Sequence, residues 1–447
     1  MSTTRLEHDL YEALSEVPVI DVHTHLVGGK LGARGLHDIL LYHMAISDLY
    51  AAGCPSGARL TEYPGWPTQA EAEQRITEAL PYLKHVSNTS SSWAIRMILA
   101  DLYDWHEPIT DKNWKKLDSQ IRERADDRAW HRDVLRELNI KRVGTEWARR
   151  EGGVDDDVLQ YVLEWVFFTR CQWGEYDTAI YELERAWGKQ PEAATPIGKR
   201  PPVEREIRTL EDVHEAVNWY VDALPKDKLL GTAQGVSTDL SLNPVSEQEM
   251  LAALGRRAQA GERERSIYAA YVNELYLSTL EEKAPGLAFQ FSFGAEPLPF
   301  ETGARLSQES IAQVGAMCSR HPKLRFQVFL ASRHANQSIC TLCREIPNLS
   351  VAGYWWHNFF PSNIRQLIEE RLDMLPLNKQ AGFFSDAYCI EWTYGKTMIV
   401  RQCLAEALAG KVRTGQYSFE QAIDIARTIL FETPQTLLGF VPSKDLG

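Results

Sequence analysis

The sequence has 447 residues, of which 44% are hydrophobic and 24% are charged, and its formal net charge is −13. This composition is ordinary for a globular protein and excludes a largely disordered chain, a fibrous repeat and a membrane bundle. The acidic balance argues against sequence-independent binding of nucleic acid, which needs a basic surface. No stretch of the sequence is apolar enough to cross a bilayer. We therefore expect a protein that binds neither nucleic acid nor membranes.

Seven cysteines are scattered along the chain. This pattern fits reduced thiols better than a disulfide framework. Residues 1–17 contain several acidic residues and no apolar core, unlike a secretory signal peptide. We therefore predict that the protein is cytoplasmic.

Short apolar runs alternate with helical segments through most of the chain. Residues 35 to about 135 read as a mostly helical insertion, rich in Trp, His and Tyr, that follows the first strand. An eighth strand is expected in the weakly patterned region between residues 85 and 105. The other strand candidates are Pro18–His25, Ile140–Thr145, Leu229–Ala233, Leu287–Phe293, Leu324–Leu330, Leu349–Trp356 and Gly382–Asp386.

Two of the helical segments have clear signals at their ends. Apolar side chains from Val213 to Leu224 follow the spacing of a buried helical stripe, and Thr209 precedes them as the N-cap. Ser246 and Glu249 predict a capping box at the start of another helix.

The alternation of strands and helices predicts parallel strands joined by helical crossovers. We predict an α/β protein whose residues 1–447 form a single (β/α)8 barrel of the TIM type, with the helical insertion after its first strand. An open doubly wound sheet is the alternative, but the sequence lacks the glycine-rich turn that binds a dinucleotide or a phosphate in such sheets.

The sharpest local feature is the sequence Asp-Val-His-Thr-His at the end of the first strand candidate. Residues two apart on a strand point to the same side, so His23 and His25 would project together. Two neutral imidazoles on one rigid element can bind a divalent transition metal. A chance pair on a solvated strand end is the alternative. The carboxyl end of a barrel strand favours the metal site, because barrel active sites lie on that face.

A carboxylate, Asp386, ends the last strand candidate. Closure of a barrel places the last strand beside the first, so this carboxylate would face His23 and His25. It is a candidate third metal ligand, a general base, or both in turn. An N-cap of the following helix is the alternative.

These features together resemble the uronate (glucuronate) isomerases of the amidohydrolase superfamily. The most specific match is Gly353–Asn358, which is similar to the family's Gly/Ala-Trp-Trp-Phe-Asn segment, because tandem Trp followed by Asn at a strand end is rare by chance. Ile140–Glu146 is similar to the family's third strand. The resemblance covers nearly the whole chain, and its other segments are Asp21–His25, Asn88–Leu102, Leu229–Asn243, Phe289–Ala295 and Asp386.

The resemblance implies one divalent metal ion, with zinc expected, bound by His23, His25 and Asp386. It also implies aldose–ketose isomerisation of a hexuronate by proton transfer between C2 and C1 of the open-chain sugar. The expected partner is thus a small sugar acid of carbohydrate metabolism, and we expect a homo-oligomer.

The reaction needs a base near C2, an electrophile on the carbonyl oxygen and a cation for the sugar carboxylate. Asp386 is the candidate base, and His43 or the metal is the candidate electrophile. Arg333, at the end of the sixth strand candidate, is the candidate partner of the carboxylate, with a surface salt bridge as its alternative. Trp355 and His357 are candidates for binding the substrate.

Three positions depart from the family pattern. Met44 stands where the family has a tyrosine, Tyr388 where it usually has an arginine, and Ser292 where it has a histidine. Tyr388 is a candidate replacement for the missing phenol, although it cannot replace a guanidinium. Glu146 is a candidate second acid or a structural partner of a nearby arginine.

These departures keep two other functions open. One is a metal-dependent hydrolase, such as a lactonase or amidohydrolase, or a decarboxylase acting on a related polyhydroxy acid. The other is a degenerate barrel that binds a sugar acid without catalysis.

Overall fold

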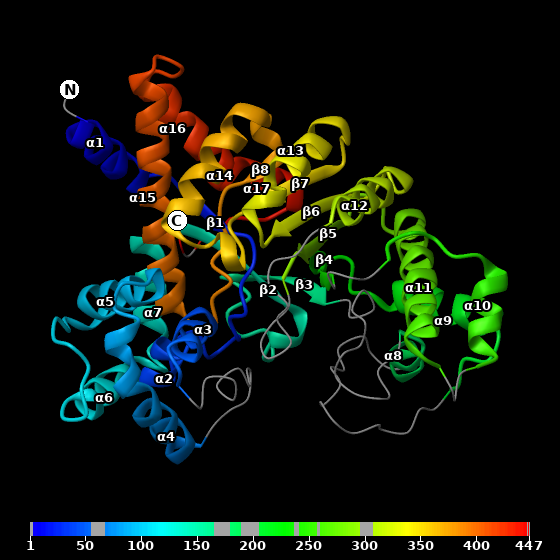
Figure 1. Ribbon diagram of the computed structural model, residues 1–447, viewed down its shortest axis with the longest axis horizontal. Coiled ribbons are helices and arrows are strands. Elements are labelled where there is room, and N and C mark those ends of the chain that lie inside the picture. The colour runs from blue at the N-terminus through cyan, green and yellow to red at the C-terminus, as the bar shows by residue number, and fades with distance from the viewer. Residues whose placement is uncertain are drawn as a thin grey trace.

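The strands of the protein form one eight-stranded sheet in the order β1 to β8, and each strand runs parallel to its neighbours (Figure 1). The computed structural model describes residues 3–54, 68–164, 179–188, 205–236, 241–256, 260–295, 307–444 and 446. The strands are β1 Val19–Asp21, β2 Ile140–Glu146, β3 Leu159–Glu164, β4 Leu229–Val236, β5 Ala288–Phe293, β6 Arg325–Leu330, β7 Leu349–Ala352 and β8 Gln380–Ala381.

The two edges of this sheet meet beyond the ends of β1 and β8. The described residues form no strand ladder between these strands, but the segments that follow them are joined by backbone hydrogen bonds. The Val22 amide donates to the Phe383 carbonyl at 3.4 Å, and the His25 amide donates to the Ala387 carbonyl at 2.8 Å. The sheet therefore curls into a barrel at its carboxyl end, which confirms the predicted TIM-type α/β fold.

Helices surround the sheet and fill the connections. None of the helices in the described ranges has the length and apolar character that a membrane crossing needs. The α-helices are α1 Thr3–Ser15, α2 Leu36–Leu40, α3 His43–Ala51, α4 Gln69–Ala79, α5 Ser90–Tyr103, α6 Trp114–Arg124, α7 Arg128–Glu137, α8 Ala179–Ala186, α9 Leu210–Ala223, α10 Glu247–Leu254, α11 Glu262–Lys283, α12 Gln308–Arg320, α13 Asn336–Glu345, α14 Pro361–Met374, α15 Ile390–Arg413, α16 Phe419–Arg427 and α17 Thr433–Leu438.

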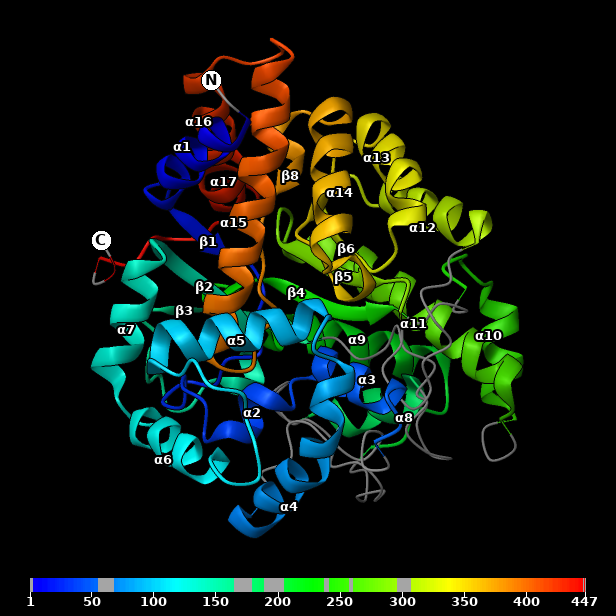
Figure 2. The same ribbon diagram turned by 60° about the vertical axis from the view of Figure 1, so that its left-hand side comes forward.

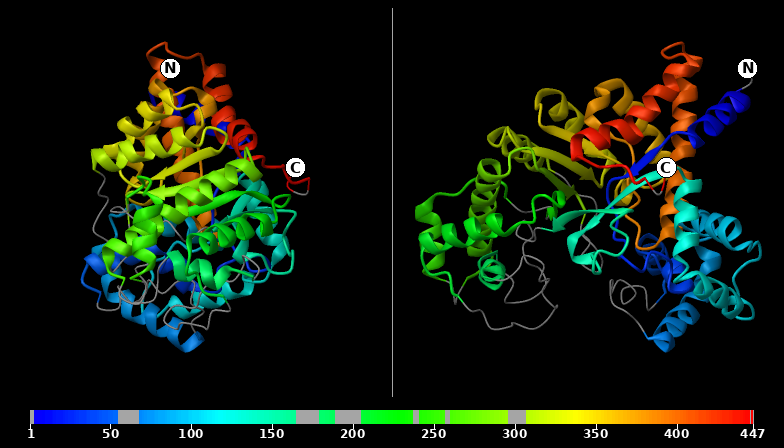
Figure 3. Two further views of the ribbon diagram at one scale, coloured as in Figure 1. Left: turned by 90° about the vertical axis from the view of Figure 1, so that its right-hand side faces the viewer. Right: turned by 180° about the vertical axis from the view of Figure 1, so that it is seen from behind.

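The helices between β1 and β2 gather around one end of the long helix α15. Figure 2 shows α5 crossing α15 there, with α2, α3 and α6 beyond it. Helices α9, α10 and α11 stand at the opposite end of the sheet, as the view from behind in Figure 3 makes clear. The boundaries of the insertion and the single-domain division stay predictions.

Apolar side chains fill the interior of the barrel. One buried cluster takes Ile20 from β1, Phe329 from β6 and further residues from every other strand except β2. Leu438 and Phe440, from the end of the chain, join the same cluster. Burial of these side chains on the inner face stabilises the barrel, because each apolar side chain removed from water contributes about 1.5–3 kcal/mol.

Two predicted helices are confirmed with their caps. Helix α9 begins after Thr209, whose side chain accepts a hydrogen bond from the Asp212 amide, and the predicted apolar stripe is buried. Helix α10 begins after Ser246, which forms the predicted capping box with Glu249.

The predicted position of the eighth strand is wrong. The region between residues 85 and 105 forms α5, which begins after the N-cap Thr89 and buries Ile95, Ile98 and Leu99 at helical spacing. The missed strand is β3, a short segment in which Gln160 and Glu164 stand among apolar residues, and so short a segment does not by itself distinguish a strand from a buried helix. Because it pairs with β1 and no strand lies between the two in the described residues, Ile140–Glu146 is the second strand of the barrel and not the third.

Two predicted strands are longer than the observed ones, because β1 ends at Asp21 and β7 ends at Ala352. The predicted last strand, Gly382–Asp386, is misplaced, because β8 ends at Ala381 and the predicted residues all follow it. The Gly382 amide donates to the Ile429 carbonyl at 2.7 Å instead of continuing a ladder. Asp386 therefore lies in the loop after β8 and not in the strand. After β7, Trp356 takes a left-handed conformation with φ of 52°, so strand alternation does not set its direction.

Candidate metal centre

The segment that carries His23 and His25 is fixed by backbone hydrogen bonds on both sides. The Thr24 amide donates to the Gly144 carbonyl of β2 at 2.8 Å, and the Asp386 amide donates to the His23 carbonyl at 3.0 Å. A Cβ at Gly144 would lie 2.5 Å from the Val22 carbonyl oxygen, so only glycine permits this close approach of the two chains. The segment is thereby held extended, and the two imidazole rings lie with centroids 5.1 Å apart.

Asp386 meets these imidazoles as the sequence predicts. Its Oδ1 lies 3.1 Å from His25 Nε2 and 3.9 Å from His23 Nε2. Its backbone has φ of 55°, a left-handed conformation that Asp tolerates better than most residues. The preceding amide, of Ser385, donates to Asp21 Oδ1 at 2.8 Å, so the aspartate of the first strand orders this turn.

The alternative reading of Asp386 as a helix N-cap is wrong. Helix α15 begins at Ile390, and Cys389 occupies its N-cap position.

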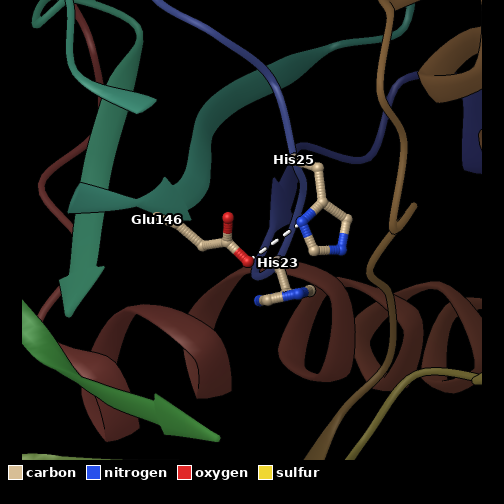
Figure 4. Close-up of side chains that lie close together, drawn as sticks. All are labelled: His23, His25 and Glu146. Atoms are coloured by element: carbon tan, nitrogen blue, oxygen red, sulfur yellow. Dashed lines mark ion pairs between the residues drawn. The ribbon is translucent and has the colours of Figure 1, made fainter. Parts of the chain in front are cut away.

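A second carboxylate, Glu146 at the end of β2, lies on the other side of His25. Its Oε1 is 3.0 Å from His25 Nδ1, and Figure 4 shows the two groups facing each other with His23 beside them. Its Oε2 accepts a hydrogen bond from Arg149 Nε at 2.5 Å. His23, His25 and Glu146 each offer a ligand atom within 4.8 Å of the others, so they could hold a metal ion. The pairing of Glu146 with an arginine is therefore present, and its role as a second acid stays a prediction.

Burial and neighbouring charges shift the pKa values of the two imidazoles in opposite directions. Burial lowers the pKa of His23 to about 4, and the charge of His25 acts in the same direction. Burial also disfavours the charged form of His25, but Glu146 and Asp386 outweigh it and raise the pKa of His25 to about 9. In the metal-free protein His25 is therefore protonated between the two carboxylates, whereas His23 is neutral.

The donor set fits a divalent transition metal. Imidazole and carboxylate are the ligands that zinc commonly takes, and ligand atoms about 2.0–2.2 Å from one ion lie about 3.3–3.6 Å apart in a tetrahedral site. The distances from Asp386 Oδ1 to the two Nε2 atoms are close to this range. His23 Nδ1 is buried without a hydrogen-bond partner among the described residues.

The two ring nitrogens of His25 contact different carboxylates, and this suggests different roles for Asp386 and Glu146. Its Nε2 faces Asp386, and its Nδ1 faces Glu146. In metal sites the ring nitrogen opposite the metal commonly contacts a carboxylate that orients the imidazole. Because Glu146 also binds Arg149, the contacts favour Asp386 as the ligand and Glu146 as the residue that orients His25.

Tyr388 lies against this cluster. Its ring stacks on the imidazole of His25, with centroids 4.5 Å apart and planes 14° apart. The guanidinium of Arg149 lies 5.6 Å from the centre of the same ring. A guanidinium is therefore present beside Tyr388, although it comes from the end of β2 and not from the position two residues after Asp386.

Arg333 and its neighbour His334 lie away from the candidate metal centre. Both are exposed in the short helix Arg333–Ala335 that follows β6. The guanidinium of Arg333 donates to Gln366 of α14, and no contact with the histidines or carboxylates of the centre is present among its described contacts. Within the described residues, Arg149 is thus the arginine that lies with the centre.

The remaining predicted site residues are only partly described. Trp355 is half-buried and packs against the interior cluster that includes Phe329, which is itself a neighbour of His23. His43 is the first residue of α3, and His357 lies in the short helix after β7. Their side chains lie outside the described part of the structure.

Sequence reasoning missed Tyr42 and Lys396 as neighbours of the centre. It included Arg149, with Arg150, as a possible partner of Glu146, because a short helical turn brings residues three apart together. Tyr42 and Lys396 had no comparable signal, since nothing in the local sequence shows that α15 passes the loop of Asp386.

The fold and the centre together define an α/β-barrel protein with two imidazoles after its first strand and a carboxylate after its last. No family model and no curated protein sequence matches the chain significantly. Solved structures with the same fold include the uronate isomerase from Thermotoga maritima, with a TM-score of 0.75, 13% identity and 97% of each chain covered.

Two further structures show the same likeness. For the uronate isomerase from Bacillus halodurans C-125, the TM-score is 0.70 at 16% identity, and 99% of this chain and 98% of that chain are covered. For the glucuronate isomerase from Caulobacter crescentus, the TM-score is 0.78 at 13% identity, with 100% and 96% covered. The chain therefore has the fold of the uronate isomerases over its whole length, which confirms the predicted resemblance at the level of the fold.

Proposed function

We propose that the protein is a metal-dependent isomerase that interconverts the aldose and ketose forms of a hexuronate such as glucuronate or galacturonate. The observation that carries the proposal is the meeting of His23, His25 and Asp386 at the carboxyl end of a barrel that matches uronate and glucuronate isomerases from end to end. We propose zinc as the ion, the cytoplasm as its location and a homo-oligomer as its assembly.

The chemistry needs a base that moves one proton between neighbouring carbons. Asp386 is proposed to take the proton from C2 and to return it to C1, because it is a buried carboxylate held by its backbone on both sides. When bound by His23, His25 and Asp386, the metal supplies a Lewis acid that polarises the carbonyl oxygen of the open-chain sugar. Tyr388, stacked on His25, is the proposed proton donor to that oxygen, and its phenolate is proposed to regain a proton from the C2 hydroxyl as C2 becomes the carbonyl carbon.

The sugar carboxylate needs a cation near the same place. Arg149 is proposed for this role because its guanidinium lies beside Tyr388 and its side chain is 13% exposed. Arg333, Trp355, His43 and His357 stay candidate residues for binding or catalysis. The contact of Arg333 with Gln366 makes Arg149 the better placed of the two arginines.

The test is to incubate the zinc-loaded protein with D-glucuronate and D-galacturonate in D2O and to follow the sugar by proton NMR. The proposal predicts appearance of the ketose, with loss of the C2 proton signal. Asp386→Asn provides the matched control, because it keeps the shape of the side chain and removes its charge.

Two other outcomes would replace the proposal. Hydrolysis of the corresponding lactones without ketose formation would identify a hydrolase on the same scaffold. Absence of any bound metal in the purified protein, even after zinc addition, would identify a barrel that has lost catalysis.

A further inference from the structure

Next to the candidate metal centre lies a buried lysine that has no carboxylate partner among the described residues. Lys396, in the first turns of α15, is 2% exposed. Its Nζ lies 4.9 Å from the ring centre of Tyr42 and 4.5 Å from that of Phe359. None of the carboxylates in the described part of the chain forms an ion pair with this ammonium group, although burying an unpaired cation is costly.

A second buried lysine of the same helix, Lys411, has the carboxylate partner that Lys396 lacks in the described structure. Lys411 is 8% exposed and forms an ion pair with Asp373 at 2.6 Å. Lys396 instead donates a hydrogen bond to the hydroxyl of Tyr42 at 2.8 Å. Burial lowers the pKa of Lys396 to about 8, while the charges of Asp386 and Asp21 act against this shift.

The hydroxyl of Tyr42 also forms a hydrogen bond to a residue of the candidate metal centre. It donates a hydrogen bond to the backbone carbonyl of Asp386 at 2.7 Å. The Tyr42 ring is itself fixed, because it stacks on Trp392 at 4.3 Å and the indole of Trp392 donates to the Ile39 carbonyl. Two hydrogen bonds in series thus connect an ammonium group to the peptide of Asp386.

The backbone of Asp386 has an unfavourable conformation that neighbouring groups must stabilise. Asp386 has a left-handed backbone, which is unfavourable for a residue with a Cβ. Its amide is held by the His23 carbonyl, so the hydrogen bond from Tyr42 fixes the other end of the residue. Loss of that bond would leave a buried carbonyl without this donor and would let the turn relax.

We propose that Tyr42 and Lys396 are positioning residues that hold the Asp386 peptide in its left-handed conformation and thereby set the affinity of the centre for its metal. The proposal rests on the proposed function only in assuming that Asp386 is a metal ligand. It is independent of the substrate and of the reaction.

The experiment measures zinc affinity by competition with a chromophoric chelator for the full-length protein and three variants. Tyr42→Phe removes the hydroxyl and keeps the ring, Lys396→Met removes the charge and keeps the length, and the third variant combines both changes. Lys411→Met is the matched control, about 22 Å away along the same helix axis. Thermal unfolding of each metal-free protein is measured in parallel.

We expect zinc affinity to fall by about 10- to 100-fold in both single variants, as for other groups that orient metal ligands. The double variant is expected to bind zinc within about threefold of the weaker single variant, because both changes act through one hydroxyl. Lys411→Met is expected to lower the unfolding temperature and leave zinc affinity unchanged.

The result that overturns the inference is zinc affinity within threefold of wild type in both single variants. The same would follow if Lys411→Met weakened zinc binding as much as Lys396→Met, since affinity would then track stability alone. If the wild-type protein itself bound no zinc, the proposed metal centre would fail first and this inference with it.

Discussion

Two strand ends of this barrel carry conspicuous polar residues, and only one of them forms a centre. After β1, His23 and His25 meet Glu146 of β2 and Asp386 of the loop after β8, and all four are largely buried. After β6, Arg333 and His334 enter a short helical turn at once and are exposed. The carboxyl end of a barrel strand is therefore not sufficient to place a side chain in a site.

The difference between the two ends comes from their neighbours. The segment after β1 stays extended because backbone hydrogen bonds join it to β2 on one side and to the loop after β8 on the other. The chain after β6 turns outward, and Arg333 donates a hydrogen bond to Gln366 of α14. Closure of the sheet, which joins residues more than 350 positions apart, is thus what builds the centre.

The largest effect is expected from Asp386→Asn. The change removes the only carboxylate that lies near the Nε2 atoms of both histidines among the described contacts. We expect isomerisation to fall by about 10³-fold or more, because both a ligand and a base are lost, and zinc binding to weaken at the same time. Asp373→Asn, which changes the exposed partner of the buried Lys411, is the control. Retention of full activity in Asp386→Asn would remove this residue from the chemistry.

A smaller effect is expected from Glu146→Gln, which removes a charge behind His25 and keeps the side-chain shape. If Glu146 orients His25, zinc affinity should fall by about 10- to 100-fold. Chelator competition measures the change. If zinc binding were abolished as completely as in Asp386→Asn, Glu146 would itself be a metal ligand, and the distinction between the two carboxylates would be wrong.

Zinc binding should also release about one proton at pH 7.5. The pKa of His25 is raised to about 9 in the metal-free protein, so its imidazole is protonated there, and a metal ligand must be neutral. Release should disappear as the pH rises above 9, because the proton has already left. Titration with zinc in a weakly buffered solution with a pH indicator measures it. A constant release from pH 7 to pH 10 would show that another group loses the proton.

The smallest effect is expected at the other strand end. Arg333→Gln should change kcat and KM for the hexuronate by no more than about twofold, as for an exposed side chain outside the site. Arg149→Gln is the informative comparison, since that guanidinium lies beside Tyr388. A tenfold rise in KM for Arg333→Gln, with no rise for Arg149→Gln, would reverse the assignment of the two arginines.

The sequence predicted the architecture better than the ends of its elements. Strand–helix alternation indicated the barrel, and local patterns indicated the caps at Thr209 and Ser246. The same patterns misplaced one strand, because α5 is weakly amphipathic and β3 is too short to show a clear period. Strand ends were set by contacts distant in sequence, such as the Gly382 amide on the Ile429 carbonyl.

For the centre, the sequence predicted which residues meet but not how they are held. The His-x-His spacing and the final aspartate were enough to place His23, His25 and Asp386 together. The roles of Tyr42 and Lys396 depend on the course of α15 past the loop of Asp386, which no local pattern contains. The exposure of Arg333 depends on the outward turn after β6.

The most direct measurement is a crystal structure of the zinc-soaked protein with anomalous data collected at the zinc absorption edge. The account predicts one strong anomalous peak within about 2.0–2.2 Å of His23 Nε2, His25 Nε2 and a carboxylate oxygen of Asp386. A peak at any other position, or an ion bound to the histidines and Glu146 with Asp386 turned away, would contradict it.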